Sequence, residues 1–293
     1  QFRGGYSIEL FVWYFGNSYQ LEGNHKDKLF TIRIVQPNIE QREKWKKENE
    51  SKNLNILLKL SEKKPYPDLV IWPETSVTWL PEENNDKLIN ILTKIKTPLI
   101  LGALRVDRKK KEIFNSSFLI DKNGQIVSIY DKSHLVPFGE YFPFSRFLGS
   151  INFFGKHKLL RKGFSSGNGL KVIDEISIPP FVTLICYESL FSNEIIGKIK
   201  DAKWLVNITN DAWFGKKGGP KQHLAIARMR ALENNLPLVR VANTGISAKI
   251  NKFGKVTKYI PIDKRGFIDV KVNREDIIQH SSYNKMGKNI SSY

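Results

Sequence analysis

The chain of 293 residues contains a single cysteine, Cys186. One cysteine excludes a disulfide framework within the chain and is too few for a zinc knuckle, so any role of this thiol is chemical or simply that of a packed side chain. Long apolar runs are also missing, because a helix that spans a bilayer needs about 18 to 20 consecutive apolar residues. The longest candidates, residues 8–16 and 98–106, have about half that length. The first of them is followed by no small-residue cleavage site and does not resemble a signal peptide.

Acidic residues are scarce. There are 47 Lys and Arg residues against 29 Asp and Glu, which gives a net charge of +18 and a pI near 9.7. At 41% hydrophobic residues the chain is too apolar to be disordered, so the charge belongs to a folded surface. The basic runs Arg105–Lys111 and Lys216–Lys221 would be phosphate contacts in a nucleic-acid module. No recognised nucleic-acid motif accompanies them, and we expect no nucleic-acid partner.

Apolar and β-branched runs alternate with amphipathic segments along the chain, and no domain boundary is visible after residue 29. Asn123-Gly124 and Phe253-Gly254 mark two hairpins between such runs. Mixed strands with helices between them predict an α/β layered sandwich. We expect strands at 29–36, 68–72, 98–104, 114–121, 125–130, 181–185, 204–208, 238–242, 246–250 and 255–260, and helices at 38–63, 83–96, 188–200 and 220–234.

Three of these strands end on a reactive side chain, at the place where layered α/β folds gather their ligands. Glu74 follows the strand that Pro73 ends, and walls of Trp72 and Trp79 would raise its pKa into the range of a general base. The alternative is a solvated glutamate that caps the next helix. Lys132 follows another strand and would hold a fixed positive charge, although a lysine in so basic a chain is usually solvated.

Cys186 ends the third of these strands and leads into a predicted helix. A thiol at such a turn lies near the positive end of the helix dipole, which favours the thiolate and makes the residue a candidate nucleophile. The alternative is an inert, buried cysteine. Glu140 is a further candidate in the segment that follows Lys132, whereas His134 is expected to be structural.

The order of Glu74, Lys132 and Cys186 resembles the nitrilase superfamily, whose catalytic set is Glu, Lys and Cys. Within that superfamily the chain resembles the bacterial apolipoprotein N-acyltransferase family over roughly residues 29–272. This resemblance implies a four-layer αββα sandwich with Cys186 as nucleophile, Glu74 as general base and Lys132 as stabiliser of the transition state. The segments that carry it read WPE, YDKSHLVPFGEYFP, ICYES, NITNDAWFG and QHLAIARMRALENNLPLVRVANTGISA.

The resemblance also implies a supporting set. Glu140 matches a second glutamate of the family's site, Tyr187 and Glu188 match residues beside the nucleophile, and Trp213 lies in a loop that would line the pocket. Packing is the alternative for each of these four side chains. Asn210 and Asp211 are expected to shape the same loop. The five histidines show no ligand spacing, so we expect no metal and no cofactor.

The activity implied is acyl transfer in bacterial lipoprotein maturation, from a phospholipid through a Cys186 thioester to the α-amine of a diacylglyceryl-cysteine on an apolipoprotein. The family works at the inner membrane with its catalytic domain on the periplasmic face, where the +18 charge would help docking to anionic headgroups. We expect residues 29–275 to form this domain, with 1–28 a linker from a preceding span and 276–293 a tail toward a following one. The alternative is a soluble amidase of the same superfamily.

Overall fold

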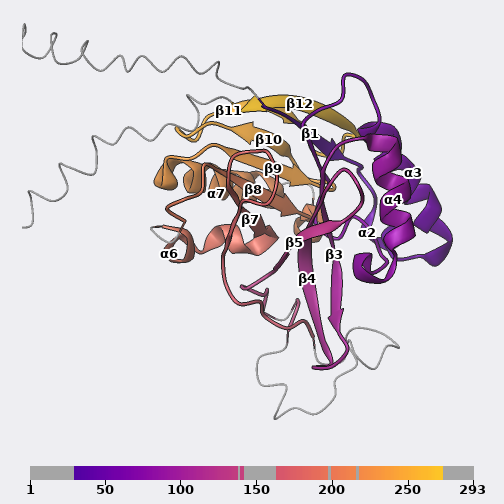
Figure 1. Cartoon of the computed structure of the whole chain (residues 1–293). Coiled ribbons are helices and arrows are strands. Elements are labelled where there is room, and N and C mark those ends of the chain that lie inside the picture. The colour runs from indigo at the N-terminus through magenta and orange to yellow at the C-terminus, as the bar shows by residue number, and fades with distance from the viewer. Residues whose placement is uncertain (1–29, 138, 142–162, 197–198, 216–217, 273–293) are drawn as a thin grey trace, which may run out of the picture.

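The computed structural model describes residues 30–137, 139–141, 163–196, 199–215 and 218–272. Within these ranges, a pair of six-stranded sheets stacks face to face between layers of helices (Figure 1). The four-layer αββα sandwich is thereby confirmed. The segments expected to be a linker (1–28) and a tail (276–293) lie outside the described residues. None of the described helices has the length and apolar content needed to cross a bilayer.

The first sheet joins the two ends of the folded region, since its last strand pairs antiparallel with its first. In spatial order it contains β12 (Gly266–Val272), β1 (Phe30–Gln36), β2 (Leu69–Ile71), β3 (Leu99–Asp107), β4 (Glu112–Ile120) and β5 (Ile126–Asp131). The second sheet contains, again in spatial order, β11 (Val256–Ile260), β10 (Ser247–Ile250), β9 (Leu238–Ala242), β8 (Trp204–Thr209), β7 (Phe181–Ile185) and β6 (Val172–Ile173).

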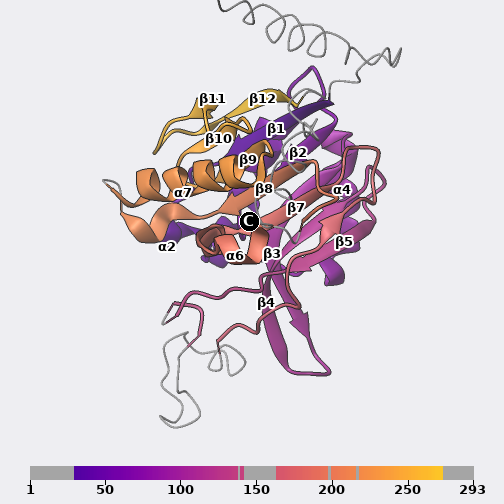
Figure 2. The same ribbon diagram turned by 90° about the vertical axis from the view of Figure 1, so that its left-hand side faces the viewer.

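The helices cover the outer faces of the two sheets (Figure 2). On the first sheet these are α3 (Glu50–Ser61) and α4 (Asn85–Ile95), and on the second they are α6 (Ser192–Ile195) and α7 (Gly219–Asn234). Short connecting turns are α2 (Gln41–Lys44) and the 3₁₀ helices η1 (Lys47–Asn49), η2 (Pro81–Glu83), η4 (Cys186–Leu190) and η5 (Asp211–Phe214).

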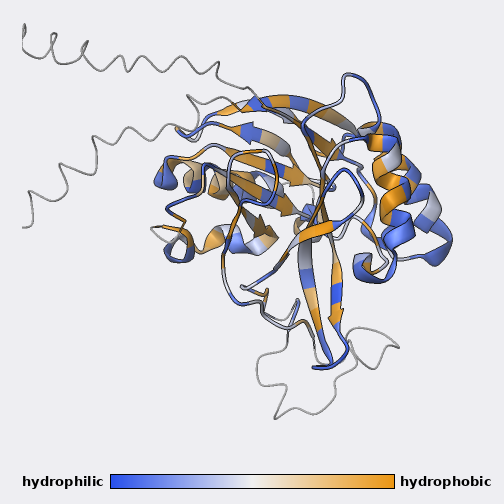
Figure 3. Cartoon of the chain, viewed as in Figure 1, coloured by the Kyte–Doolittle hydropathy of each residue, from blue (hydrophilic) through white to orange (hydrophobic). Residues whose placement is uncertain are grey.

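The core has three layers, and the two-residue period of a strand decides which layer each side chain enters. In β2, Leu69 and Ile71 point into the cluster between the sheets, whereas Val70 and Trp72 point outward beneath α3 and α4. Both faces of the central strands are therefore buried, as their nearly continuous apolar sequence requires. Figure 3 shows this apolar content concentrated within the sandwich.

Parallel pairing brings the reactive strand ends to one edge of the sandwich. In the first sheet β1, β2 and β3 are parallel, and β5 runs in the direction of β3 because each is antiparallel to β4. In the second sheet β7, β8 and β9 are parallel. The carboxyl ends of β2, β5 and β7 lead to Glu74, Lys132 and Cys186, as the sequence predicts.

Two predicted helices are wrong in extent. Residues 38–63 form α2, η1 and α3 in place of one helix, because Lys46 between them adopts an extended conformation. The described part of 188–200, which excludes 197 and 198, contains the end of η4 and the four residues of α6, because Phe191 and Ile196 leave the helical region. The strand predicted to end at Leu104 continues to Asp107, and β6 and β12 were not predicted.

Truncation of Ile208 tests the layer between the sheets, where this side chain is completely buried. We expect Ile208→Ala to lower the free energy of unfolding by about 2–5 kcal/mol, because it removes buried methylene groups and leaves a cavity. Met229→Ala on α7 is the control, because Met229 is 52% exposed and its loss changes stability by about 0.5 kcal/mol at most. Urea denaturation followed by circular dichroism measures both; equal losses would contradict this packing.

Candidate active site

Glu74 lies on a tight turn after β2 that neighbouring backbone and a buried lysine hold in place. Thr75 has a φ of 43°, in the left-handed region, and Gly102 of β3 packs directly against the turn. The Nζ of Lys44 donates to the carbonyl oxygen of Glu74 at 3.1 Å and to Thr75 Oγ1 at 2.6 Å. Burial lowers the pKa of Lys44 to about 8, although the charge of Glu74 opposes this shift. The turn is thus fixed independently of the glutamate side chain.

The carboxylate of Glu74 is buried among polar partners from both sheets. Its Oε1 accepts from Asn115 Nδ2 of β4 at 2.7 Å, and its Oε2 accepts from the backbone N–H of Asn210 at 2.8 Å. Burial raises the pKa of Glu74, with Lys132 opposing the shift and Glu140 adding to it. The prediction that Trp72 walls the Glu74 carboxylate is wrong. The Trp72 indole lies in the layer under the helices and donates to Ser61 Oγ.

Lys132 lies between two carboxylates at the end of β5. Its Nζ is 2.8 Å from Glu140 Oε1 and 3.9 Å from Glu74 Oε1, and the side chain is almost fully buried. Burial disfavours the ammonium, but Glu74, Cys186 and Glu140 together outweigh burial and raise the pKa of Lys132. The solvated alternative is therefore excluded, and the lysine is a fixed positive charge within the site.

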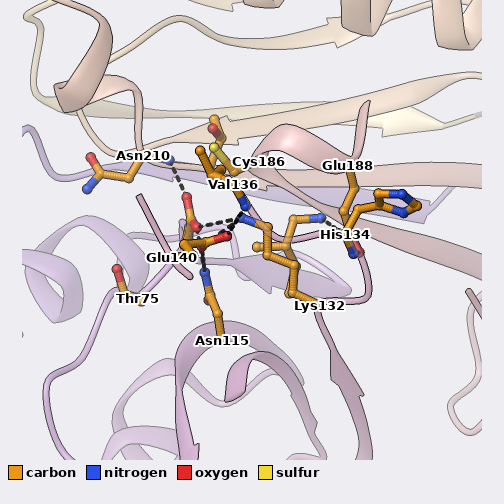
Figure 4. Close-up of polar contacts among 12 residues, drawn as sticks. Thr75, Asn115, Lys132, His134, Val136, Glu140, Cys186, Glu188 and Asn210 are labelled. Atoms are coloured by element: carbon orange, nitrogen blue, oxygen red, sulfur yellow. Dashed lines mark hydrogen bonds and ion pairs between the residues drawn. The ribbon is translucent and has the colours of Figure 1, made fainter. Parts of the chain in front are cut away.

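Glu140 is brought to this cluster as expected, and its carboxylate links three segments. Besides Lys132 it accepts from Asn115 Nδ2 at 3.2 Å and from the backbone N–H of Val136 at 2.8 Å (Figure 4). The Nδ2 of Asn115 therefore bridges Glu140 and Glu74. The Oδ1 of Asn115 is buried and has no hydrogen-bond partner among the described residues.

Cys186 starts η4 with a φ of 50°, a strained value for a residue with a side chain. The thiol is buried; burial, together with the charge of Glu74, raises its pKa to about 12, against the opposing effects of Lys132 and a hydrogen bond with Thr209. The expected thiolate is therefore wrong for the resting site. The helix that would favour it is a five-residue 3₁₀ turn, so the thiol needs a base to remove its proton.

Glu188 holds the turn of the nucleophile to the loop that carries Lys132. One oxygen accepts from the backbone N–H of Ile185 at 2.7 Å. The other accepts from Tyr130 OH at 2.6 Å, from Ser133 N at 2.6 Å and Oγ at 2.9 Å, and from His134 N at 3.2 Å. Because these hydrogen bonds occupy both of its oxygens, Glu188 acts on the position of other residues.

The two aromatic candidates lie outside the polar cluster. Tyr187 is half-buried with its ring edge toward Phe191, which in turn stacks on His134 with centroids 3.9 Å apart. Trp213 belongs to η5, after β8, and is 73% exposed. The structure thus places both side chains beside the cluster, while Glu74, Lys132, Glu140 and Cys186 come together within it.

A buried network behind Cys186 was missed by prediction from sequence. Asp211 forms an ion pair with Arg240 at 2.8 Å and contacts His223 Nδ1 at 2.9 Å. The Nε2 of His223 lies 3.1 Å from both the carbonyl oxygen of Cys186 and Ser189 Oγ. Burial opposes ionisation of Asp211, but Arg240 and His223 outweigh it and lower its pKa to about 2. The expectation that Asn210 and Asp211 shape their loop agrees with these contacts.

The comparisons with known proteins agree with this geometry. The carbon-nitrogen hydrolase profile matches residues 31–280. The chain belongs to the carbon-nitrogen hydrolase family. Among solved structures, a carbon-nitrogen hydrolase from Helicobacter pylori G27 aligns with a TM-score of 0.67 over 92% of this chain and 96% of that one, at 17% identity. This likeness bears on the fold alone.

Curated relatives are more similar in sequence. The apolipoprotein N-acyltransferase of Rhizobium rhizogenes is 39% identical over 256 residues, which cover 81% of this chain and 47% of that protein. The apolipoprotein N-acyltransferase of Rickettsia typhi is 38% identical over 246 residues, 81% of this chain and 48% of that protein. This chain therefore spans about half the length of the curated relatives it matches. The resemblance to their family is confirmed.

Gly102 tests the position of the Glu74 turn. A Cβ at this position would lie 2.6 Å from the carbonyl oxygen of Pro73, 2.6 Å from the nitrogen of Thr75 and 2.7 Å from the Cα of Glu74. Since these are backbone atoms, the turn itself must shift, and a misplacement near 1 Å costs about a hundredfold in rate. We expect Gly102→Ala to slow alkylation of Cys186 by iodoacetamide to that degree. Gly266→Ala, which meets nothing within 4 Å, is the control, and equal rates would contradict the assignment.

The pH dependence of the same alkylation tests the base. As pH rises through the raised pKa of Glu74, its carboxylate forms and accepts the thiol proton. The rate should therefore climb with a midpoint above the ordinary 4.5 of a glutamate and level off well below the thiol's own pKa of about 12. We expect Glu74→Gln to abolish this rise. In the variant the rate should increase only as the pH approaches the pKa of the thiol itself. Mass spectrometry of Cys186 measures the rates, and an unchanged profile in the variant would assign the base elsewhere.

Proposed function

We propose that this chain is the catalytic domain of an apolipoprotein N-acyltransferase, with Cys186 as nucleophile, Glu74 as general base and Lys132 as stabiliser of the oxyanion. The observation that carries the proposal is one buried cluster in which a neutral thiol, a carboxylate of raised pKa and a paired ammonium meet. The names of the relatives at 38–39% identity support the reaction type. Residues 29–275 would form the domain.

In the first half of the reaction Glu74 takes the proton of Cys186, and the thiolate attacks the carbonyl carbon of a phospholipid acyl ester. The negative charge on the carbonyl oxygen is met by the ammonium of Lys132. The C–O bond then breaks, the lysophospholipid oxygen takes the proton back from Glu74, and a Cys186 thioester remains. In this scheme Tyr187, Trp213 and the stacked rings of Phe191 and His134 would line the path of the acyl donor.

In the second half the α-amine of a diacylglyceryl-cysteine attacks the thioester, and Glu74 accepts a proton from the amine. The C–S bond breaks, Glu74 returns that proton to the thiolate, and the product is an amide of the apolipoprotein. Glu140 and Glu188 are positioning residues in this scheme, the first for Lys132 and the second for the turn of the nucleophile. Each proton transfer in the scheme is assigned to a side chain of this chain or to a substrate.

Both proposed substrates are anchored in a membrane, so the domain would work at a bilayer surface. We place it on the periplasmic face of the bacterial inner membrane, as the family resemblance implies, with 1–28 and 276–293 as connections toward membrane spans. The alternative is a soluble amidase with the same cluster. It differs in its substrates, because an amide is the acyl donor and water is the acceptor. The two readings predict different adducts.

Exposure to a dipalmitoyl phospholipid in detergent micelles tests the proposal. We expect intact-protein mass spectrometry to find one palmitoyl group on Cys186, labile to hydroxylamine, which a diacylglyceryl-cysteine peptide then removes. Cys186→Ala should carry no adduct, and Lys132→Met should form it about a hundredfold to a thousandfold more slowly, because an oxyanion-stabilising charge is lost. Ammonia release from simple amides with no palmitoyl adduct would contradict acyl transfer and favour the amidase.

A further inference from the structure

The hairpin of β3 and β4 extends beyond the sandwich at the edge that carries the catalytic cluster (Figures 1 and 2). Leu104 pairs with Asn115, which contacts both Glu74 and Glu140, and the pairing continues outward to Asp107 and Glu112. At about 3.3 Å per residue the turn at 108–111 lies about 13 Å beyond the level of Asn115. A basic run that the active site does not use is thus presented past the catalytic edge.

The tip of this hairpin, residues 108–111, has unpaired positive charge. Arg108 pairs with Glu83 at 2.6 Å, whereas Lys109, Lys110 and Lys111 are exposed and form no ion pair with any described residue. The carboxylate of Asp107, at the base of the tip, accepts from the backbone N–H groups of Lys109 and Lys110 and lies near the charge of Lys110. In Figure 3 the tip is uniformly hydrophilic. The three lysines are therefore available to an anionic partner.

The flank of the hairpin differs from its tip. A cavity of about 340 Å³ lies beside it, and its lining mixes acidic and basic side chains. Glu82, Glu83 and Asp107 contribute carboxylates to this lining, beside Arg105 and the tip residues Arg108 and Lys109. A long polyanion laid along the flank would meet these carboxylates, whereas a flat anionic surface would meet the lysines of the tip alone. The charge distribution favours the flat surface.

An exposed aromatic side chain lies at the same edge on the second sheet. Trp213 follows β8, which is parallel to β7 and therefore ends on the side of Cys186. It is 73% exposed, and the neighbouring Phe214 is 43% exposed. Tryptophan is favoured at the boundary between lipid and water because its ring is apolar and its N–H is polar. Basic and aromatic groups thus flank the cluster on one edge.

We propose that the tip lysines and Trp213 form a docking surface for anionic phospholipids, which holds the catalytic edge against the membrane. This inference rests on the proposed function, since it supplies the surface on which that reaction would take place. Each lysine brought to an anionic membrane surface contributes about a fivefold factor in affinity. The tip should therefore account for about a hundredfold in binding.

The experiment is cosedimentation of the full chain with vesicles made of equal parts of phosphatidylcholine and phosphatidylglycerol. We expect the triple variant Lys109→Gln, Lys110→Gln, Lys111→Gln to bind about a hundredfold more weakly. The control removes the same charge at the opposite edge with Lys63→Gln, Lys64→Gln and Lys94→Gln, three exposed lysines that precede β2 and β3. It should bind as the unmodified chain does. Addition of Trp213→Ala to the tip variant should weaken binding to the vesicles further.

Equal losses in the two triple variants would overturn the proposal in favour of general charge attraction. A duplex oligonucleotide that binds the unmodified chain and loses its affinity in the tip variant would assign the tip to nucleic acid instead. The formation of the Cys186 adduct in neutral detergent micelles should be unchanged by the tip variant. Loss of vesicle binding with an intact micellar reaction therefore supports the docking surface, whereas failure of the micellar reaction in the unmodified chain would contradict the proposed function alone.

Discussion

One ammonium buried between two carboxylates governs the architecture of this site. Lys132 would be costly to bury alone, and so would Glu74, because an unpaired charge away from water is strongly disfavoured. The pairing of Lys132 with Glu74 and Glu140 offsets most of this cost, but each carboxylate still needs further hydrogen-bond donors. Those donors come from β4 through Asn115 and from the loop after β8 through the N–H of Asn210. The charge cluster consequently helps to join the two sheets at this edge, together with the hydrogen bonds of Glu188.

The same cluster sets the protonation states. Burial raises the pKa of both Glu74 and Cys186; Glu140 adds to the shift of Glu74, and the charge of Glu74 adds to that of Cys186, so Cys186 rests as a thiol. A proton can then move between two groups without entering water. When negative charge develops on a bound carbonyl oxygen, Lys132 is already fixed beside it and needs no reorganisation. The buried, protonated thiol thus lies near the carboxylate that can take its proton.

Prediction from sequence succeeded where one local signal decides the structure. Apolar β-branched runs such as Phe181–Ile185 gave strands with correct ends, and the side chains after them proved to share one edge. Prediction failed where tertiary contacts decide. The helix expected at 188–200 gives way to a 3₁₀ turn and the four residues of α6, and the Glu188 side chain within that turn binds Ser133 of the Lys132 loop. Asn115 was missed although the polar run Asn-Ser-Ser within a strand is itself a signal.

The network behind the nucleophile was beyond prediction, because Asp211, His223 and Arg240 meet only after folding. Asp211 contacts His223 Nδ1, and the Nε2 of the same ring lies 3.1 Å from the carbonyl oxygen of Cys186 and from Ser189 Oγ, whose hydroxyl donates to that carbonyl oxygen. Asn210, the residue before Asp211, binds the base through its backbone. One loop is therefore tied at its side chain to the strained turn of the nucleophile and at its backbone to the carboxylate of Glu74. A shift of that loop must move the nucleophile and its base together, which preserves the geometry between them.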